Sequence, residues 1–547
     1  MGKLFTSVLN RRLEKFLESN QIITPAQAGF RKTFSTVDNM FVLHLLADIL
    51  KIKKKKLFCA FIDFSKAFDK VWRIGLWQKM FKSGINGKFL NVVKNIYNNI
   101  KSCIVSNSST SNYFPCQTGV KQGENLSPLL FSIYLNDLES DLSNKGCEGV
   151  GIDYSTDNVT LMIHFILLLY ADDTVLLADN ANSLQLTLND FNDYCLRWKL
   201  EVNTSKTKIL IFGSGPASKN KFSFYINNKV VNIVDTYTYL GIEFHRNRRF
   251  VHSIKAIVNK ANKAMFCLLK KSRNLSLPLD CMIKAFDIMI LPILLYGCEV
   301  WGHENTAIIE KKHLKFLKLA SGLKMSTPNY MVYGELGRTP LSININKRMI
   351  AFWRKLTETN IPIKLSCMLN TIIKDDNIVK NYNLKWLNHI KTTLNDCGLT
   401  YLFNNHKGYK LELLVEQILT DQFTQKWKAE IQTSSKGLFY KHFKNSLHFE
   451  NYLLLPNYIS KPLLKIRTTN HKLPIETGRW ENVPKENRTC KLCNSPAVAD
   501  ELHYLLNCQA CSTLRSKHLH KYLTWSNPIS IKIIMHQTKL SDFQIYK

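Results

Sequence analysis

Two adjacent carboxylates, Asp172 and Asp173, lie between apolar runs in the segment LYADDTVL. The runs at residues 163–169 and 175–178 predict two buried strands joined at the turn that holds this doublet. Asp is a common turn residue, so an acidic doublet can be merely turn-forming. Adjacent carboxylates nevertheless repel each other and lose hydration in such a place, which is tolerable when a bound divalent cation neutralises them. A metal site of this kind predicts a third carboxylate nearby.

Asp63 meets that expectation, because it ends the apolar strand predicted at residues 57–62. Three carboxylates from separate strands can hold two hard cations ~4 Å apart. Such a pair of cations activates an attacking oxygen and stabilises a leaving phosphate. These residue types therefore indicate phosphoryl transfer.

A second cluster of metal-ligating residue types lies near the end of the sequence. The spacing C-x2-C-x9-H-x4-C is made by Cys490, Cys493, His503 and Cys508. Four such ligands suit one tetrahedral structural Zn²⁺, with Cys511 as an alternative to Cys508. Because Arg488, Lys491 and Arg515 lie nearby, we expect this zinc knuckle to bind nucleic acid.

The motifs around these residues resemble those of one enzyme family. Successive palm motifs of the reverse transcriptases of LINE-type, non-LTR retrotransposons are similar to AFIDFSKAFDKV, GVKQGENLSPLLFSIYLNDL, LLYADDTVLLA, NTSKTKILIF and YLGIEF. The family's fingers motif is similar to QAGFRKTFSTVDNM, and its C-terminal half is similar to LLYGCEVWG, KIRTTNHKLPIETGRW and the Cys/His cluster. The resemblance covers nearly the whole chain. It implies an RNA-directed DNA polymerase that uses an RNA template, a DNA primer or target, and dNTPs.

The resemblance also implies catalytic roles for individual residues. Asp63, Asp172 and Asp173 would hold two Mg²⁺ ions. Lys206, in NTSKTK, matches a lysine that can protonate the departing pyrophosphate, although an ordinary surface lysine in a turn is the alternative. Asp69 lies beyond the end of the predicted strand, so we expect it to serve structure and not the metal.

Substrate contacts follow from the same resemblance. Arg31 matches the fingers arginine that grips the triphosphate with its planar fork. Phe68 would be a steric gate that collides with a 2′-hydroxyl, the alternative being a core phenylalanine. Gln122 and Gly123 would contact the nucleotide or the template, and Tyr170 would contact the substrate. Residues 239–241 resemble the primer grip, a hairpin that holds the growing end.

The expected fold class is α+β, a right-hand polymerase with fingers, palm and thumb, followed by a mostly helical C-terminal region and a zinc knuckle. Residues 1–50 predict two helices around a loop at 29–31, one with Leu9, Leu13 and Phe16 on one face and one with an apolar face of Val42, Leu43, Leu45 and Leu46. Ser127 is expected to be a helix N-cap and Pro128 a first-turn residue, followed by the apolar face Leu129, Leu130, Ile133 and Tyr134.

Four regions are expected: fingers and palm at 1–245, a thumb-like helical region at 246–345, a helical C-terminal region at 346–484, and the zinc knuckle at 485–520. A linker is predicted at 213–221, GSGPASKNK. The thumb-like region carries a stripe of lysines that would either track a phosphate backbone or form a solvated face: Lys255, Lys260, Lys263, Lys270 and Lys271.

The composition favours a polyanionic partner. The chain of 547 residues has 74 Lys and Arg against 42 Asp and Glu, a formal net charge of +32, although coding bias can also produce a basic composition. Fourteen cysteines and no opening secretory signal point to a reducing, intracellular compartment, nucleus or cytoplasm. The longest apolar run, at 161–170, is too short for a bilayer that needs ~20 residues, so no membrane partner is expected. Residues 51–56, KIKKKK, favour a solvated turn over a nuclear import signal.

The sequence begins at MGKLFTSVLNRRL, where family members usually carry further fingers sequence and an endonuclease domain. We therefore expect an incomplete fingers region, which leaves a catalytically weak or inactive nucleic-acid-binding remnant as the competing interpretation. Group II intron maturases and telomerases are disfavoured, because neither is expected to pair the GRW segment with the Cys/His knuckle.

Overall fold

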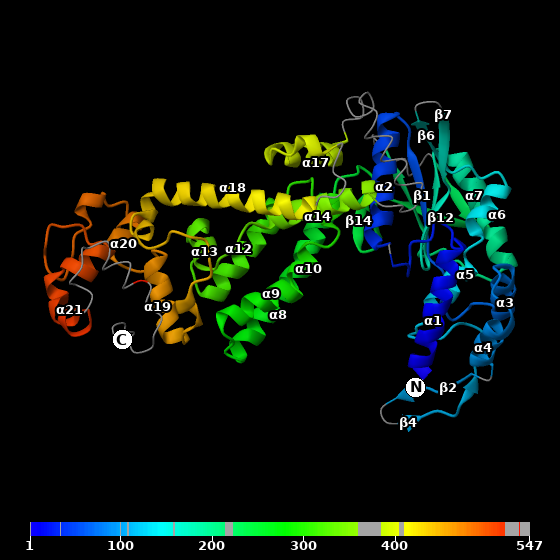
Figure 1. The fold of residues 1–547 in the computed structure, drawn as a ribbon, viewed down its shortest axis with the longest axis horizontal. Coiled ribbons are helices and arrows are strands. Elements are labelled where there is room, and N and C mark those ends of the chain that lie inside the picture. The colour runs from blue at the N-terminus through cyan, green and yellow to red at the C-terminus, as the bar shows by residue number, and fades with distance from the viewer. Residues whose placement is uncertain are drawn as a thin grey trace.

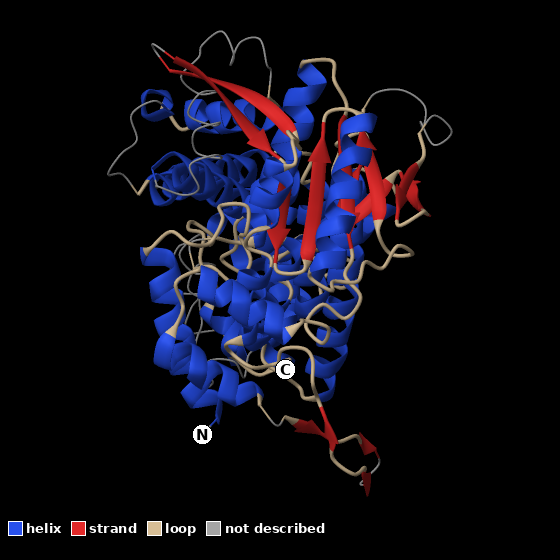
Figure 2. Ribbon diagram, turned by 90° about the vertical axis from the view of Figure 1, so that its right-hand side faces the viewer, coloured by secondary structure: helices blue, strands red, loops and turns tan. Residues whose placement is uncertain are grey.

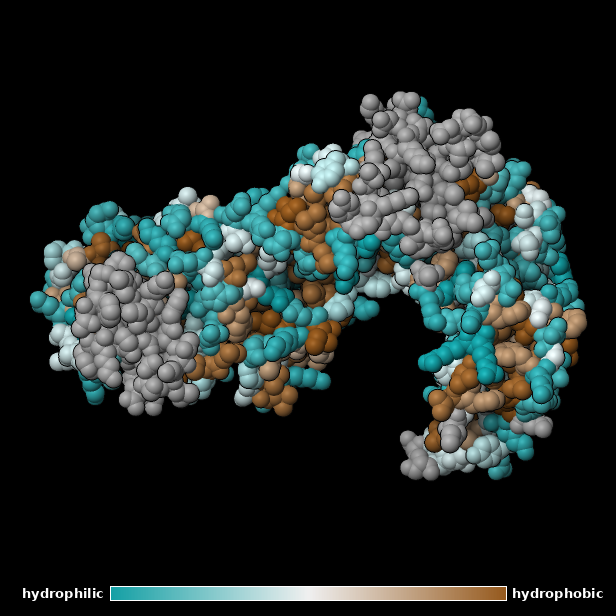
Figure 3. Space-filling model, in the orientation of Figure 1, coloured by the Kyte–Doolittle hydropathy of each residue, from teal (hydrophilic) through white to brown (hydrophobic). Residues whose placement is uncertain are grey.

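The computed structural model describes residues 2–32, 34–98, 100–106, 109–156, 159–213, 222–358, 384–403, 410–519 and 535. The molecule is elongated, with the N-terminal half at one end and the last helices at the other (Figure 1). The space-filling view shows an open hollow between the lobe that carries the first helix and the middle of the molecule (Figure 3). The predicted linker at 213–221 lies outside the described residues, apart from Gly213.

A six-stranded sheet organises the N-terminal half, in the spatial order β11-β12-β10-β1-β9-β8. Neighbouring strands are antiparallel except for β10 and β12, which are parallel. Helices surround the strands (Figure 2). The strands are β1 (Leu57–Ile62), β8 (Leu167–Tyr170), β9 (Asp173–Ala178), β10 (Lys208–Phe212), β11 (Phe224–Ile226) and β12 (Lys229–Val234).

The central strand β1 is buried along its whole length. Its odd-numbered residues join a core with α2 (Thr36–Ile52), and its even-numbered residues join a second core with α5 (Ser127–Tyr134) and α7 (Ala181–Arg197). Successive side chains of a strand point to opposite faces of the sheet. The uninterrupted apolar run LFCAFI is therefore what a strand covered on both faces requires.

The predicted acidic hairpin is present, but the first of its two strands is shorter than expected. Strands β8 and β9 pair with Tyr170 opposite Asp173, which confirms the turn at the doublet. One strand over 163–169 is wrong: residues 163–165 end β7 (Val159–Phe165), which pairs with β6 (Val150–Thr156) in a separate hairpin. The chain changes partner at Ile166, whose carbonyl already accepts from the amide of Leu177 in β9. An unbroken apolar run carries no signal for such a change.

The two predicted N-terminal helices are present as α1 (Gly2–Ser19) and α2, and the predicted face of α2 is buried. In α1, Leu9 and Leu13 are buried as expected, but the prediction for Phe16 is wrong, because this side chain is 38% exposed and Leu17 is buried instead. Residues four apart lie on the same helix face, so Leu17 continues the stripe of Leu9 and Leu13. The turn predicted at 51–56 is present but shorter, because α2 continues to Ile52 and the turn occupies residues 53–54.

Helix α5 begins differently from the prediction. Ser127 is its first residue and makes no capping bond, so the expected N-cap is wrong. The buried hydroxyl of Ser127 instead donates to the carbonyl of Lys121 at 2.5 Å, which ties the preceding loop to the helix. Pro128 lies in the first turn, and the predicted apolar face is buried, both as expected.

Smaller elements complete this half. They are α3 (Arg73–Lys82), α4 (Gly87–Tyr97), α6 (Leu138–Asn144), β2 (Lys101–Ser102), β3 (Val105–Ser106), β4 (Ser109–Thr110) and β5 (Phe114–Pro115). A hairpin of β13 (Thr236–Tyr239) and β14 (Ile242–His245) leads into the helical half.

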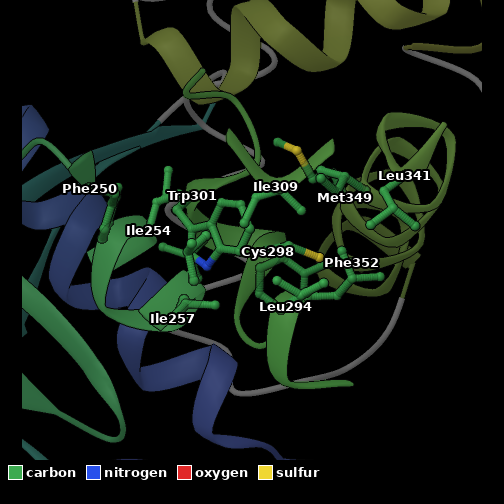
Figure 4. Close-up of a cluster of buried hydrophobic side chains, with 14 of the residues drawn as sticks. Phe250, Ile254, Ile257, Leu294, Cys298, Trp301, Ile309, Leu341, Met349 and Phe352 are labelled. Atoms are coloured by element: carbon green, nitrogen blue, oxygen red, sulfur yellow. The ribbon is translucent and has the colours of Figure 1, made fainter. Parts of the chain in front are cut away.

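The middle of the molecule is helical. Its helices are α8 (Val251–Asn274), α9 (Leu279–Met289), α10 (Leu291–Leu294), α11 (Cys298–Trp301), α12 (Ala307–Ser321), α13 (Asn329–Glu335) and α14 (Leu341–Glu358). All five lysines of the predicted stripe lie exposed on α8. The core of this region surrounds the fully buried Trp301, with Ile254 and Ile257 of α8 on one side and Met349 of α14 on the other (Figure 4).

The C-terminal region is mostly helical in its described part, as predicted. It contains α17 (Lys385–Asp396), α18 (Leu411–Thr433), α19 (Asn457–Arg467), α20 (Pro474–Trp480) and α21 (Ser512–His518). Among the described residues, no helix is both long and apolar enough to cross a membrane.

Candidate active site and metal centre

The register of the sheet brings the three predicted carboxylates together. Strand β1 pairs with β9 so that Ile62 lies opposite Thr174. Continuing this antiparallel register by one residue sets Asp63 against Asp173. Asp172 lies in the two-residue turn just before Asp173, so all three carboxylates meet at one end of the sheet.

Electrostatics show that these carboxylates share one site. Burial, Asp172 and Asp63 together raise the pKa of Asp173 to about 6. Burial and the charge of Asp63 also raise the pKa of Asp172. Asp63 thus makes ionisation of both other carboxylates less favourable, and Asp172 does the same to Asp173. A set of oxygen donors with this unbalanced negative charge fits hard divalent cations.

A loop before α2 fixes the turn of the acidic hairpin. The side-chain oxygen of Gln27 accepts from the amides of Gly29 and Ala171, at 2.9 and 3.1 Å. A Cβ at Gly29 would lie 2.4 Å from the amide nitrogen of Ala171, so only glycine fits there. From α2, the side-chain Nδ2 of Asn39 donates to the carbonyl of Leu169 at 3.0 Å. Sequence reasoning missed Gln27 and Asn39, although Gln27 opens the fingers motif.

A second loop holds Asp63 from the opposite side. The amide of Asp63 donates to the hydroxyl of Thr207 at 3.2 Å, and its carbonyl accepts from the amide of Asn203 at 2.8 Å. Thr207 is fully buried, and this contact too was missed by sequence reasoning. Lys206 belongs to the same loop and is exposed beside the site. Its role as a proton donor stays a prediction.

The predicted nucleotide-contact residues differ in their surroundings, and Gln122 lies in the wall of a cleft. Phe68 is half-buried and stacks on Phe131, with ring centroids 5.0 Å apart. The side chain of Gln122 donates to Asp69 at 3.0 Å, and both line a cleft of about 550 Å³. Gly123 has a φ of +77° and open space where a Cβ would stand, which suits close approach of a base pair. Tyr170 is half-buried at the end of β8, and the substrate contacts of these residues remain predictions.

Arg31 lies in the predicted loop, but its fork already has a partner. Its guanidinium donates to the two carboxylate oxygens of Glu18 in α1, at 2.7 and 2.8 Å. It also lies over the ring of Phe34, 4.3 Å from the centroid. Gripping a triphosphate would therefore require Arg31 to exchange Glu18 for the phosphates.

The segment at 239–241 forms the predicted hairpin. Leu240 and Gly241 have φ values of 47° and 84°, as the tightest hairpin turns between two strands require. Tyr239 is buried beneath the turn. From outside, the hydroxyl of Tyr296 donates to the carbonyl of Leu240 at 2.7 Å. Tyr296 belongs to the segment LLYGCEVWG and is a contact that the sequence did not indicate.

The Cys/His cluster is assembled as the spacing predicts. The ligand atoms of Cys490, Cys493, His503 and Cys508 all lie within 4.8 Å of one another, which favours Cys508 over Cys511 as the fourth member. The Sγ of Cys493 lies 3.4 Å from Nε2 of His503. Four soft donors at this separation fit a tetrahedral metal ion.

Two of the three basic residues near the cluster serve its structure. Arg488 donates to the carbonyls of Val483 and Ile475, and Arg515 donates to the carbonyl of Cys508. Of the three, only Lys491 is exposed, and Arg488 and Arg515 are half-buried. The prediction that all three face nucleic acid therefore finds its support mainly in Lys491.

Comparison with known proteins agrees with this geometry. Residues 1–244 match the family model described as reverse transcriptase (RNA-dependent DNA polymerase). The chain is 25% identical over 334 residues to the RNA-directed DNA polymerase from mobile element jockey of Drosophila funebris, a match covering 58% of this chain and 33% of that protein. It is 24% identical over 369 residues to the probable RNA-directed DNA polymerase from transposon X-element of Drosophila melanogaster, covering 65% of this chain and 38% of that protein.

The chain thus spans little more than a third of the length of these relatives. A solved structure of apo telomerase from Candida tropicalis matches with a TM-score of 0.34 and 14% identity, covering 66% of this chain and 61% of that one, a likeness too loose to carry an argument. The motifs, the carboxylate geometry and the family match agree, and residues 1–244 belong to the reverse transcriptase family, among the enzymes of LINE-type, non-LTR retrotransposons.

Proposed function

We infer that the chain is an RNA-directed DNA polymerase that adds dNTPs to a primer 3′-hydroxyl on an RNA template. The observation that carries this proposal is the meeting of Asp63, Asp172 and Asp173 at one end of the sheet, where burial and the charge of Asp63 raise the pKa of the other two. In the reaction, the 3′-oxygen attacks the α-phosphate, and the bond to the departing pyrophosphate breaks.

The three carboxylates would hold two Mg²⁺ ions. Bound there, the ions would supply the positive charge that favours the ionised 3′-hydroxyl and stabilises the leaving pyrophosphate. The backbone contacts of Gln27 and Thr207 keep the carboxylates in place before substrate arrives. Lys206, exposed on the neighbouring loop, would give a proton to the pyrophosphate.

Substrate selection and template contact are assigned to the other predicted residues. Phe68 would pack against the sugar, and Gln122 and Gly123 would contact the base pair. Tyr170 would lie at the primer end beside Asp173. We assign residues 1–245 to fingers and palm, 246–345 to a thumb, 346–484 to a helical region and 485–520 to a knuckle with one structural Zn²⁺.

Asp172→Asn tests the proposal, because the amide keeps the shape of the side chain and removes its charge. Primer extension on an RNA template with Mg²⁺ should fall by about 100-fold or more, while the affinity for RNA stays within a factor of two. Asp179→Asn is the matched control, since Asp179 follows the same strand and its side chain contacts the surface Lys55 and its neighbour Asn180. Extension by the Asp172 variant at the parental rate would contradict the proposal. An unaltered chain that binds RNA but extends no primer would instead be a nucleic-acid-binding remnant.

A further inference from the structure

A cleft of about 300 Å³ lies far from the carboxylates, in the C-terminal region. Its walls come from four segments: the residues after α18, Thr469 after α19, helix α20 with the turn that follows it, and residues 500–502 just before His503. The motif KIRTTNHKLPIETGRW contributes Thr469 and Arg479 to this cleft. The proposed polymerase chemistry uses none of these residues.

Three lysine side chains without a partner among the described residues line this cleft. Lys436, Lys441 and Lys485 line it, and within the described part of the chain none of their ammonium groups makes a hydrogen bond or an ion pair. Lys436 lies close enough to Glu476 to lower the pKa of that carboxyl, against the larger effect of burial. Unpaired ammonium groups in the walls of one cavity favour an anionic ligand.

The acidic residues of the same walls are already engaged. Glu476 forms an ion pair with Arg479, with Nε and the carboxylate oxygen 3.2 Å apart, and Glu501 contacts the ring of His471 at 2.8 Å. Asp500 accepts the amide of His503 at 2.8 Å, which fixes the start of the cluster's last segment. The three carboxylates are therefore occupied within the protein, and the lysines are left for a ligand.

Thr469 supplies an independent observation that points to a ligand. Its side chain is only 8% exposed, and its hydroxyl has no hydrogen-bond partner among the described residues. Its φ is 53°, a value that a β-branched residue rarely adopts. A buried hydroxyl without a partner, on a strained backbone that lines a cavity, is costly unless something in the cavity bonds to it.

We propose that this cleft binds one phosphate and sugar unit of a single-stranded nucleic acid, with the three lysines and the Thr469 hydroxyl on the phosphate. The remaining wall is apolar: Leu438 is 44% exposed, and Phe439 and Ile475 lie beside it. Such a wall suits a sugar or base and gives nothing to a small free anion. This inference rests on the proposed function only in that the chain handles nucleic acid.

The first test removes the charge of the cleft. The triple variant Lys436→Gln, Lys441→Gln, Lys485→Gln should bind a 12-nucleotide single strand roughly 10-fold more weakly, and its salt dependence should lose about one phosphate contact. Fluorescence anisotropy of the full chain at two salt concentrations measures both quantities. The matched control is Lys426→Gln, Lys428→Gln, Lys461→Gln, three exposed lysines on α18 and α19 that lose the same charge. Equal losses in the two triple variants would overturn the proposal.

The second test separates a ligand contact from a structural role. Thr469→Val keeps the shape and the β-branched backbone preference but removes the hydroxyl. If the hydroxyl bonds to phosphate, affinity for the strand should fall about 3-fold while the Tm of the free protein stays level or rises, since an unpaired buried donor is lost. Unchanged affinity, or a loss of affinity that merely follows a lower Tm, would contradict the assignment.

Competitors identify the ligand. RNA and DNA strands compared side by side show which sugar is preferred, and inorganic phosphate should compete only weakly because it lacks the apolar part. A poly-glutamate peptide that competes as well as RNA would replace nucleic acid with an acidic protein segment and overturn the proposal. All readouts are binding and can be repeated with Asp172→Asn, so failure of the proposed polymerase activity would leave this test intact.

Discussion

The pairing of Glu18 with Arg31 competes with the role predicted for Arg31. Glu18→Gln should weaken the two hydrogen bonds and free the guanidinium for a triphosphate. We expect the KM for dNTP to fall about 3-fold, the factor that corresponds to ~0.6 kcal/mol for a partly exposed ion pair. Single-nucleotide extension measures this KM. Glu14→Gln is the control, because Glu14 pairs with the exposed Lys32. A higher KM in the Glu18 variant would mean that the pair positions Arg31 for the substrate.

Phe68 decides which sugar is accepted if it is a steric gate. Phe68→Val should open space for a 2′-hydroxyl and raise ribonucleotide incorporation relative to deoxynucleotide roughly 10-fold or more. Competing ribo- and deoxynucleotides in single-nucleotide extension measure this ratio. Phe64→Val is the control, since Phe64 is buried in the core against Phe191. If the ratio of ribonucleotide to deoxynucleotide incorporation is the same in both variants, Phe68 is a core residue. One face of its ring already stacks on Phe131.

At the scale of residues, the sequence predicts the metal-ligating carboxylates better than the side chains that hold their backbone in place. Asp63 follows an apolar run and Asp172 interrupts one. A carboxylate at such a place loses hydration at a cost, so both residues can be recognised as candidate metal ligands from the sequence. Gln27 and Thr207 act through hydrogen bonds to the backbone of distant segments. Ordinary polar residues in loops carry no such signal, and their partners are known only once the strands are paired.

At the scale of elements, Tyr296 joins the helical middle of the molecule to the 239–241 hairpin. Its hydroxyl donates to the carbonyl of Leu240 and contacts the hydroxyl of Thr36 at 3.2 Å, and a Cβ at Gly241 would lie 3.1 Å from its ring. Tyr296→Phe should loosen the turn and raise the KM for primer about 3-fold, the loss of one hydrogen bond. The KM for dNTP should stay constant.

The control for that variant is Tyr458→Phe, which removes the hydroxyl of a tyrosine that is 62% exposed on α19. Primer titrations at saturating dNTP, and dNTP titrations at saturating primer, separate the two KM values. If both values rise together, Tyr296 supports the fold as a whole and not the hairpin.

Helix α2 also meets the helical middle through two stacked histidines. His44 is buried in α2, and its ring lies 5.5 Å from that of His303, which follows α11. Burial lowers the pKa of both, that of His303 to about 3. The charged groups around the pair are Asp48, Arg248, Glu304, Lys385 and His389.

A lowered pKa makes this contact sensitive to acid. Between pH 6.5 and about 3 the unfolded chain binds a proton at His303 that the folded chain does not, so the free energy of unfolding falls as the pH falls. The Tm of the protein should therefore drop more between pH 7 and 5.5 than that of His303→Asn, whose amide can still donate to the carbonyl of Val300. His252→Asn, an exposed position, serves as the control. If Tm falls by the same amount with pH in all three proteins, His303 does not contribute to the loss of stability in acid.

The predicted elements fail where the chain changes partner. The run 163–169 predicts one strand, yet Ile166 divides it between two hairpins. Ser127 predicts a cap, yet its hydroxyl bonds to an earlier loop. Helix α1 shows the same limit, since Leu17 and not Phe16 meets the core. Local periodicity gives the type of each element, and tertiary pairing decides its ends and its buried face.

At the scale of the whole molecule, long-range ion pairs join regions that the sequence treats as separate. Lys355 of α14 pairs with Asp38 of α2 at 2.9 Å. The fully buried Arg467 donates to both carboxylate oxygens of Glu335 and to the carbonyl of Met535. Removing one partner of such a buried pair leaves an uncompensated buried charge, which destabilises the fold. These pairs span large sequence separations, so composition and spacing cannot predict them.

The Cys/His cluster is the structural anchor at the far end of the molecule, and it braces α20. The amide of Ile475, in α20, donates to the carbonyl of Ala499, whose own amide donates to the carbonyl of Arg488. Because Cys490, Cys493, His503 and Cys508 form one four-ligand site, purified protein should carry about one zinc ion. Cys490→Ser, or a strong chelator, should release the zinc and weaken binding of single-stranded nucleic acid, because the cleft beside α20 loses one wall.

Extension of a primer already annealed to its template should stay within about a factor of two in the zinc-free protein, since the carboxylates lie in a different part of the fold. Metal analysis, binding titration and primer extension on one preparation distinguish these effects. Cys511→Ser is the matched control, because Cys511 lies outside the group of four ligand atoms. Zinc retained by Cys490→Ser would contradict the site. Zinc lost by Cys511→Ser and kept by Cys508→Ser would make Cys511 the fourth ligand.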